Sequence, residues 1–135
     1  MDADDLKRRT RAFAVRVIHL VEALPNTSAA KVVGHQLLRA GTSIGANYRA
    51  ACRARSQADF ISKIGVVEEE ADESVYWLEL LVEAAVLPAT KVQDLLDEAN
   101  ELTTLFAASG RTAKARRSSH FGADSKSEIG KYPWN

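Results

Sequence analysis

The side chains of this sequence that could support metal or acid–base chemistry are three histidines, one cysteine and many carboxylates. A di-metal site in a helical bundle needs inward glutamates and Glu-x-x-His pairs. None of the histidines has a glutamate three residues before it; these are His19, His35 and His120. Cys52 has no histidine close to it in sequence, which is typical of a structural thiol. No phosphate loop, dinucleotide fingerprint or zinc spacing occurs. We therefore expect no enzyme activity, no catalytic residue, no metal and no cofactor.

Positive and negative residues are separated into two consecutive stretches in the middle of the chain. Residues 28–55 carry no acid, and their cations are Lys31, Arg39, Arg49, Arg53 and Arg55. Residues 57–83 are rich in acids and carry a single cation, Lys63. The chain has a formal net charge of zero, so any electrostatic function depends on this local segregation. A solvated surface is one interpretation, and pairing between the two stretches is the other.

Two groups of cations predict contact with RNA or DNA. The first group shares one helical face with His35 and consists of Lys31, Arg49 and Arg53. The second contains no acid and consists of Arg111, Lys114, Arg116 and Arg117. Such clusters bind phosphates without reading base sequence. The alternative is an ordinary solvated surface on a protein-interaction scaffold.

Apolar residues spaced by three and four predict the helices that position these groups. We expect helices over residues 4–24, 28–52, 56–87 and 88–117, with Pro25 and Pro88 ending the first and third. Ser56 and Asp59 have the spacing of a capping box. Glycines within the second helix indicate either plain tolerance or the close approach of a neighbouring helix; they are Gly34, Gly41 and Gly45.

Short connections between long helices predict an all-α fold, an antiparallel up-and-down four-helix bundle. We place this bundle in residues 1–117 and a polar C-terminal tail in residues 118–135. The tail holds Phe121, Tyr132 and Trp134, which could dock on another surface. No run of about 18 apolar residues is present, and the N-terminal residues are acidic where a signal peptide is basic. We therefore expect a cytoplasmic protein with no membrane contact.

A polar stripe lies beside the apolar stripe of the second helix. It consists of Gln36, Arg39, Ser43 and Asn47, which recur at intervals of three and four. Glu70 and Glu73 form a similar stripe on the third helix. If the turn between these helices centres near residue 54 or 55, Arg39 faces Glu70 and Gln36 faces Glu73. We expect an ion-paired network there that is at least partly buried.

Several segments resemble the 23S rRNA intervening-sequence protein family, also called four-helix bundle proteins. The resemblance covers residues 6–117 and is carried by residues 36–48, 56–60, 70–74, 76–81 and 111–114. It implies a bacterial, non-enzymatic protein that forms a homo-oligomer, with a ring-shaped homopentamer favoured. A related branch acts as the accessory protein of diversity-generating retroelements and binds a reverse transcriptase and nucleic acid. An accessory or scaffold role is therefore the alternative function.

The sequence departs from the family pattern at two places. Arg49-Ala50-Ala51 stands where the family often has an acid and a glycine, and Glu69 stands where many relatives have lysine. Both departures change the surface charge, so the binding residues of relatives are not transferred. For self-association we expect Trp77, beside the apolar seam of the third helix, to act as an anchor, with simple packing on the core as the alternative.

Overall fold

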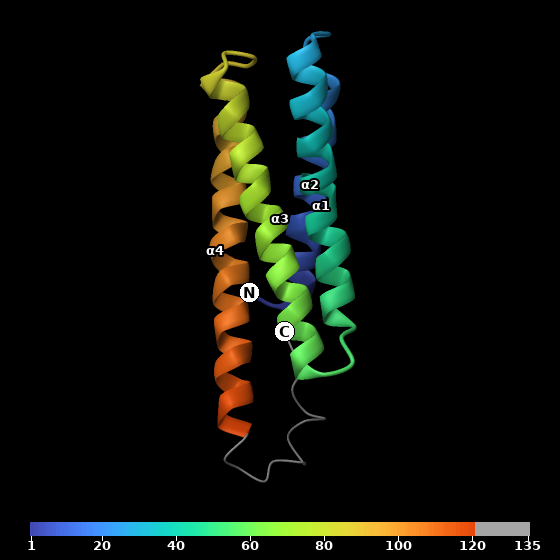
Figure 1. Cartoon of the computed structure of the whole chain (residues 1–135), viewed down its shortest axis with the longest axis vertical. Helices are drawn as coiled ribbons and strands as arrows, with labels where there is room; N and C mark the ends of the chain where they lie inside the picture. The colour runs from blue at the N-terminus through green and yellow to red at the C-terminus, as the bar shows by residue number, and fades with distance from the viewer. Residues whose placement is uncertain (121–135) are drawn as a thin grey trace.

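The computed structural model describes residues 1–120, which form four α-helices arranged up and down (Figure 1). Helix α1 spans Ala3–Glu22, α2 spans Ser28–Cys52, α3 spans Gln57–Glu83 and α4 spans Ala89–His120. The predicted all-α antiparallel bundle is therefore confirmed. Helix α4 continues past Gly110 and ends beyond the boundary predicted at residue 117. The tail aromatics Phe121, Tyr132 and Trp134 lie outside the described residues.

Apolar stripes from all four helices meet in one core. The largest fully buried side chains come from each helix in turn: Phe13 and Val17; Leu37, Ile44 and Tyr48; Phe60, Ile64, Val67, Leu78 and Leu81; and Leu102 and Phe106. The rings of Tyr48 and Phe106 meet across the core with centroids 5.2 Å apart. No helix within residues 1–120 has the length and apolar character needed to cross a membrane. The core therefore accounts for the helical periodicity of the sequence.

Helix α1 packs closely on α2 along a seam of glycines. A Cβ atom added at Gly41 would lie 2.9 Å from Val17 Cγ2 and 3.2 Å from Val17 Cβ. One added at Gly45 would lie 3.2 Å from Thr10 Oγ1. The side chain of Thr10 is buried there, and its hydroxyl donates to the Leu6 carbonyl oxygen at 2.8 Å. Close helix approach, rather than tolerance, explains these glycines.

The two ends of α3 are fixed by different local bonds. At the start, the amide of Asp59 donates to Ser56 Oγ at 3.0 Å, as a capping box requires. The Asp59 carboxylate accepts from the amide of Arg55 rather than that of Ser56. At the other end, Ala85 has a left-handed φ of 57°, and the amide of Val86 donates to the Leu81 carbonyl oxygen at 2.9 Å. This Schellman-type end stops α3 at Glu83, before the predicted terminator Pro88.

The bundle closes through an ion pair between α1 and α4. Arg9 Nη2 lies 2.6 Å from Glu98 Oε1, and Arg9 Nε donates to Glu98 Oε2 at 3.0 Å. Glu101 adds a second contact at 3.2 Å. The hydrogen bond to Glu98 raises the pKa of Arg9 above its ordinary value. A bidentate pair of this kind fixes both the distance and the register of two helices.

We predict opposite effects for alanine at two glycines of the bundle. Gly41→Ala should lower the free energy of unfolding by roughly 1–3 kcal/mol, because the added methyl group overlaps Val17. Gly65→Ala has open space around its Cβ position and should raise stability by about 0.5–1 kcal/mol through helix propensity. Denaturant unfolding of both variants measures the difference. Equal stabilisation by both would show that the α1–α2 seam is not tightly packed.

Candidate functional site

The polar network between α2 and α3 centres on Arg39. Its Nη1 lies 3.3 Å from Glu70 Oε2, its Nη2 lies 2.5 Å from Glu73 Oε2, and its Nε donates to Gln36 Oε1 at 3.3 Å. The predicted Arg39–Glu70 pair is therefore present, with Gln36 and Glu73 beside it. The register derived from the short α2–α3 turn thus brings Arg39 to Glu70 as predicted, whereas Glu73 bonds Arg39 rather than the predicted Gln36.

The remaining two residues of the predicted network behave differently. The hydroxyl of Ser43 donates to the carbonyl oxygen of Arg39 in its own helix at 2.6 Å. Asn47 is partly buried, and its side chain makes no hydrogen bond with residues 1–120. Burial is also uneven, because the side chain of Arg39 is 43% exposed and that of Glu70 is 19% exposed. The network is therefore a partly solvated cluster on the bundle surface rather than a buried one.

Charge states within the network follow from this uneven burial. The hydrogen bond that Arg39 donates to Glu73 raises the pKa of Arg39 above its ordinary value. Burial raises the pKa of Glu70 above its ordinary value of 4.5, and attraction to Arg39 only partly opposes this. Glu73 is thus the main partner of Arg39, and Glu70 is a carboxylate whose charge the fold disfavours.

A second cluster gathers cations from three helices at one end of the bundle. We call it the cationic end and define it by Arg49, Arg53, Arg55, Lys63, Arg111, Lys114, Arg116 and Arg117. Gln57 Nε2, at the start of α3, donates to the carbonyl oxygen of Ala113 in α4 at 2.9 Å. A Cβ added at Gly110 would lie 3.3 Å from Ile64 Cγ2. These contacts place the end of α4 beside the start of α3, which follows the end of α2 across the short turn, so that α3 lies between the ends of α2 and α4.

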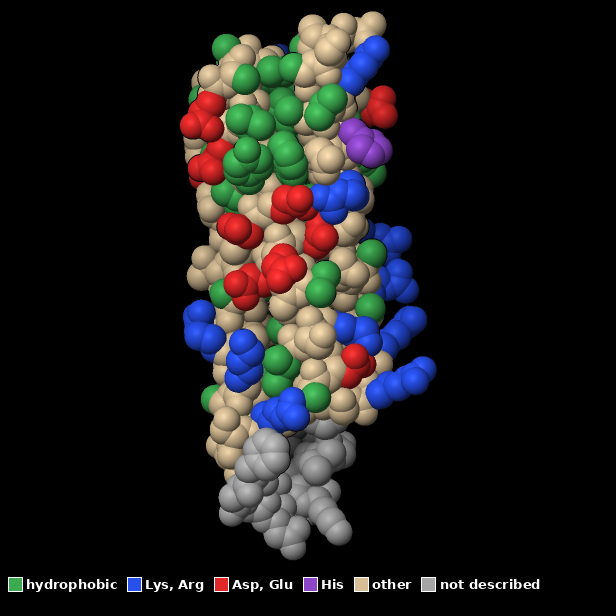
Figure 2. Space-filling model, in the orientation of Figure 1, with side chains coloured by type: hydrophobic (Ala, Val, Ile, Leu, Met, Phe, Trp, Pro, Cys, Tyr) green, Lys and Arg blue, Asp and Glu red, His purple; other side chains and the backbone are tan. Residues whose placement is uncertain are grey.

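The residues of the cationic end are mostly exposed, and acids are few among them. All of its arginines and Lys114 are exposed, and Lys63 is partly buried. Lys63 Nζ lies 2.7 Å from Asp59 Oδ2, and this hydrogen bond lowers the pKa of Asp59 below its ordinary value. Figure 2 shows most of the visible cations over the lower half of the view and most of the acids over its middle and upper parts. On another side, Asp2 and Asp4 of the α1 start line an open pocket with Thr112.

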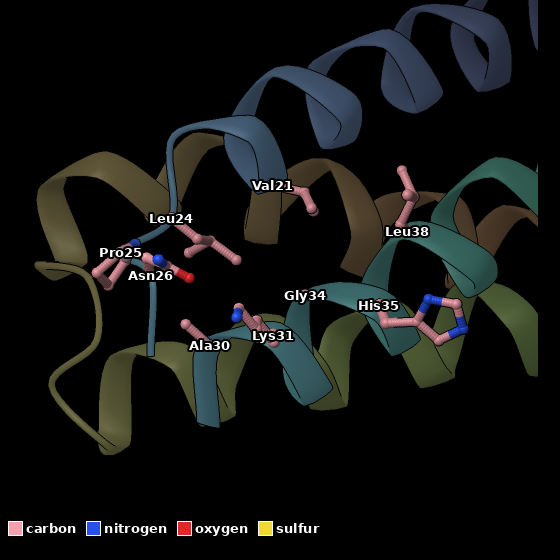
Figure 3. Close-up of a pocket in the computed structure, with 9 residues that line it drawn as sticks. All are labelled: Val21, Leu24, Pro25, Asn26, Ala30, Lys31, Gly34, His35 and Leu38. Carbon is pink, nitrogen blue, oxygen red and sulfur yellow. The ribbon is translucent and has the colours of Figure 1, made fainter. Parts of the chain in front are cut away.

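Lys31, which the sequence grouped with Arg49 and Arg53, does not belong to the cationic end. It lies in the first turn of α2, whereas Arg53 caps the other end of that helix. Lys31 and His35 line an open pocket of about 340 Å³ between the end of α1 and the start of α2 (Figure 3). The rest of its lining is largely apolar and includes Val21, Leu24 and Leu38. Residues that share a helical angle can therefore lie far apart along the helix, as Lys31 and Arg53 do.

Sequence reasoning missed two members of the cationic end, Arg55 and Lys63. Arg55 was treated only as part of the basic stretch, and Lys63 was treated as an exception within the acidic one. Both residues are close in sequence to the α2–α3 turn, and this turn must lie at the same end of the bundle as the last residues of α4. The up-and-down order of the helices was sufficient to find them.

An apolar patch occupies the upper part of the same α2–α3 face, above the acids in Figure 2. We define it by Val32, Val33, Tyr76, Trp77 and Leu80, which the Arg39 register brings to neighbouring levels of α2 and α3. The side chains of Val32 and Tyr76 are 63% and 56% exposed. Trp77 packs against the core, and its ring contacts Tyr76 edge-on with centroids 4.9 Å apart. Trp77 thus follows the core-packing alternative, and Tyr76 is the large exposed aromatic of this patch.

Other reactive side chains are scattered over the described residues. No group of three or more His, Cys, Asp or Glu within them could hold a metal ion. Cys52 is partly buried at the end of α2. The features that stand out within residues 1–120 are thus charged and apolar surfaces.

The fold and these surfaces define a class of protein: an all-α, up-and-down bundle whose charged groups are sorted along its length. The sequence profile of the 23S rRNA-intervening sequence protein family matches residues 4–108, and the chain belongs to this family.

A solved structure of the same type supports the assignment. It is the crystal structure of a protein of unknown function from the S23 ribosomal protein family of Bacteroides thetaiotaomicron. The two chains are 38% identical, with a TM-score of 0.71, and the match covers 76% of this chain and 95% of the other. None of the curated proteins matches this chain.

We predict that the two carboxylates bonded to Arg39 differ in their effect on stability. Glu70→Gln should be at least as stable as the wild type at pH 7, because the pKa of Glu70 is raised by burial. A raised carboxyl pKa favours folding below the unfolded pKa and loses that advantage as pH rises through the folded value. The gain from Glu70→Gln should therefore shrink as pH falls toward about 4.

Glu73→Gln is the matched control, because it removes the charge that bonds Arg39 most closely. It should be less stable than Glu70→Gln at pH 7. Thermal unfolding of the three proteins across pH measures both effects. If Glu70→Gln is the less stable variant at neutral pH, Glu70 rather than Glu73 is the main partner of Arg39.

Proposed function

We propose that this chain is a non-enzymatic, oligomeric protein that binds nucleic acid through its cationic end. The observation that carries the proposal is the convergence of cations from α2, α3 and α4 around the α2–α3 turn. From Glu101 to Arg117, α4 has no further acid, and α2 has none at all. The acid nearest the turn is Asp59, which is already paired with Lys63.

Exposed arginines and lysines bind nucleic acid by neutralising phosphates and releasing counterions. The cationic end offers such groups from helices that the fold holds in fixed positions, so the arrangement is preorganised. The family name refers to 23S rRNA, and that of the solved relative refers to a ribosomal protein family. These names support RNA as the first nucleic acid to test.

We predict that charge removal at the cationic end weakens binding more than equal charge removal elsewhere. The test variant replaces Arg111, Lys114, Arg116 and Arg117 by alanine. If all four contact phosphates, the slope of log K against log salt should fall by about 3. Fluorescence anisotropy with a labelled RNA at several salt concentrations measures affinity and slope.

The control variant replaces four exposed cations that lie outside the cationic end: Arg11, Arg16, Lys31 and Lys91. Its charge change is identical, and its salt slope should remain close to that of the wild type. Equal losses of RNA affinity in both variants would show that the cationic end has no special role in binding. If the wild type binds no RNA or DNA even at low salt, the protein-interaction scaffold, including a reverse-transcriptase accessory role, becomes the better function.

We also propose that copies of this chain associate through the apolar patch, with the pentamer favoured by family membership. Monomeric proteins rarely expose a continuous apolar surface, and an exposed tyrosine is a common interface anchor. Val32 and Tyr76 are the most exposed members of this patch. The Arg39 cluster borders it and would supply a polar rim, as many protein interfaces have.

We predict that Tyr76→Asp reduces the oligomer mass, because a carboxylate would then be desolvated in the contact. The wild type should have a mass several times that of the 14.7 kDa chain, and five times that mass for a pentamer. Light scattering at micromolar concentration measures it. Val15→Asp, at an exposed apolar position of α1, is the control and should keep the wild-type mass. A wild-type protein with the mass of a monomer would contradict the proposal.

A further inference from the structure

We infer that the cationic end recognises double-stranded nucleic acid by its phosphates alone and does not stack single-stranded bases. This inference rests on the proposed function and specifies its partner. It is carried by the kinds of side chain that the cationic end exposes and by those that it buries.

Among residues 1–120, the aromatic residues nearest the cationic end are turned into the core. Tyr48, Phe60 and Phe106 are each at most 1% exposed. The exposed large hydrophobic residues among positions 1–120 are Met1, Val15, Ile18, Val32, Val66 and Tyr76. Tyr76 is the one aromatic among them, and it belongs to the apolar patch at the other end of the α2–α3 face. Proteins that bind single strands gain about 1–3 kcal/mol for each base stacked on an aromatic ring. The described part of the cationic end offers no such ring.

The two amide side chains near the cationic end within residues 1–120, Gln57 and Asn47, are also occupied or withdrawn. The Gln57 amide is bonded to the carbonyl oxygen of Ala113. Asn47 is partly buried in the α2–α3 seam. The exposed groups that remain are mainly guanidinium and ammonium groups, which suit phosphate oxygens. The surface therefore has the chemistry for binding a phosphate backbone and lacks fixed groups for reading sequence.

The positions of the cations also favour a duplex over a single strand. Arg49 and Arg53 are one turn apart on α2, and Arg111 and Lys114 are one turn apart on α4. The start of α3 lies between these two pairs, held to α4 by the Gln57 bond. Packed helices are about 8–10 Å apart, so the cations cover a surface wider than one strand. A duplex presents two phosphate backbones to such a surface.

Counterion release gives the size of the expected preference. The salt slope is about −0.9 for each phosphate contact on a B-form duplex and about −0.7 on a single strand. With about five contacts at 50 mM salt, this difference alone favours the duplex on the order of ten-fold. Without stacking on aromatic rings, nothing at the described surface offsets it.

The experiment measures binding of the full chain to a 20-base-pair RNA duplex and to a 20-nucleotide uridine strand, which cannot pair with itself. A second duplex of unrelated sequence tests for base reading. The duplexes should bind on the order of ten-fold more tightly than the strand at 50 mM salt, with similar affinities for the two duplexes. The same measurements are repeated with Phe121, Tyr132 and Trp134 replaced by alanine, because these aromatics lie outside the described residues.

The outcomes separate this inference from the proposed function. A duplex preference in the alanine-substituted chain supports phosphate recognition by the cationic end. Equal or tighter binding of the uridine strand by both chains would overturn the inference but leave nucleic-acid binding intact. A difference of more than about ten-fold between the two duplexes would show sequence reading and would also overturn it. Absence of binding to every probe would overturn the proposed function itself.

Discussion

The short turn between α2 and α3 sets the register on which the surfaces of this bundle depend. Ser56 caps α3 directly after the turn, so the two helices leave it at a fixed level. This level brings Arg39 between Glu70 and Glu73, far from the turn in sequence. A shift of one residue would rotate each side chain by about 100° around its helix. The polar network, the apolar patch above it and the cationic end beside the turn are all consequences of this one alignment.

Antiparallel packing changes the meaning of the charge pattern. Along the sequence, cations dominate residues 28–55 and acids dominate the following helix. In the bundle, both the C-terminal half of α2 and the C-terminal half of α4 point the same way, and their cations gather around the turn. The central acids of α3 lie beside Arg39 instead. Cations and acids therefore occupy different levels along the bundle as well as different helices. The net charge of zero is the sum of these separate positive and negative regions.

Helical periodicity made the fold and the Arg39 register predictable, because each depends on local spacing and one tight turn. The α3 end was not predictable, since Ala85 adopts a left-handed conformation where glycine is usual. Nor was the Arg9–Glu98 pair, because closure between the first and last helices depends on every intervening turn and packing angle. Helical angle identifies a face but gives no position along the axis, which is why Lys31 shares an angle with Arg53 yet lies at the other end of α2. The sequence also left open whether Trp77 is exposed or packs on the core, because it lies beside the apolar seam, and the structure shows core packing.

Placement of the two proposed contact surfaces at opposite ends of the α2–α3 face has a mechanical consequence. Contact at the apolar patch would leave Arg53, Arg55 and the end of α4 accessible, so self-association and nucleic-acid binding need not compete. The Arg39 cluster lies between the two surfaces, and its ion pairs hold α2 and α3 together where neither surface provides contacts. If several cationic ends are joined, weak phosphate contacts add through high effective concentration. A modest local charge is then sufficient, which agrees with a chain whose cations and acids are equal in number.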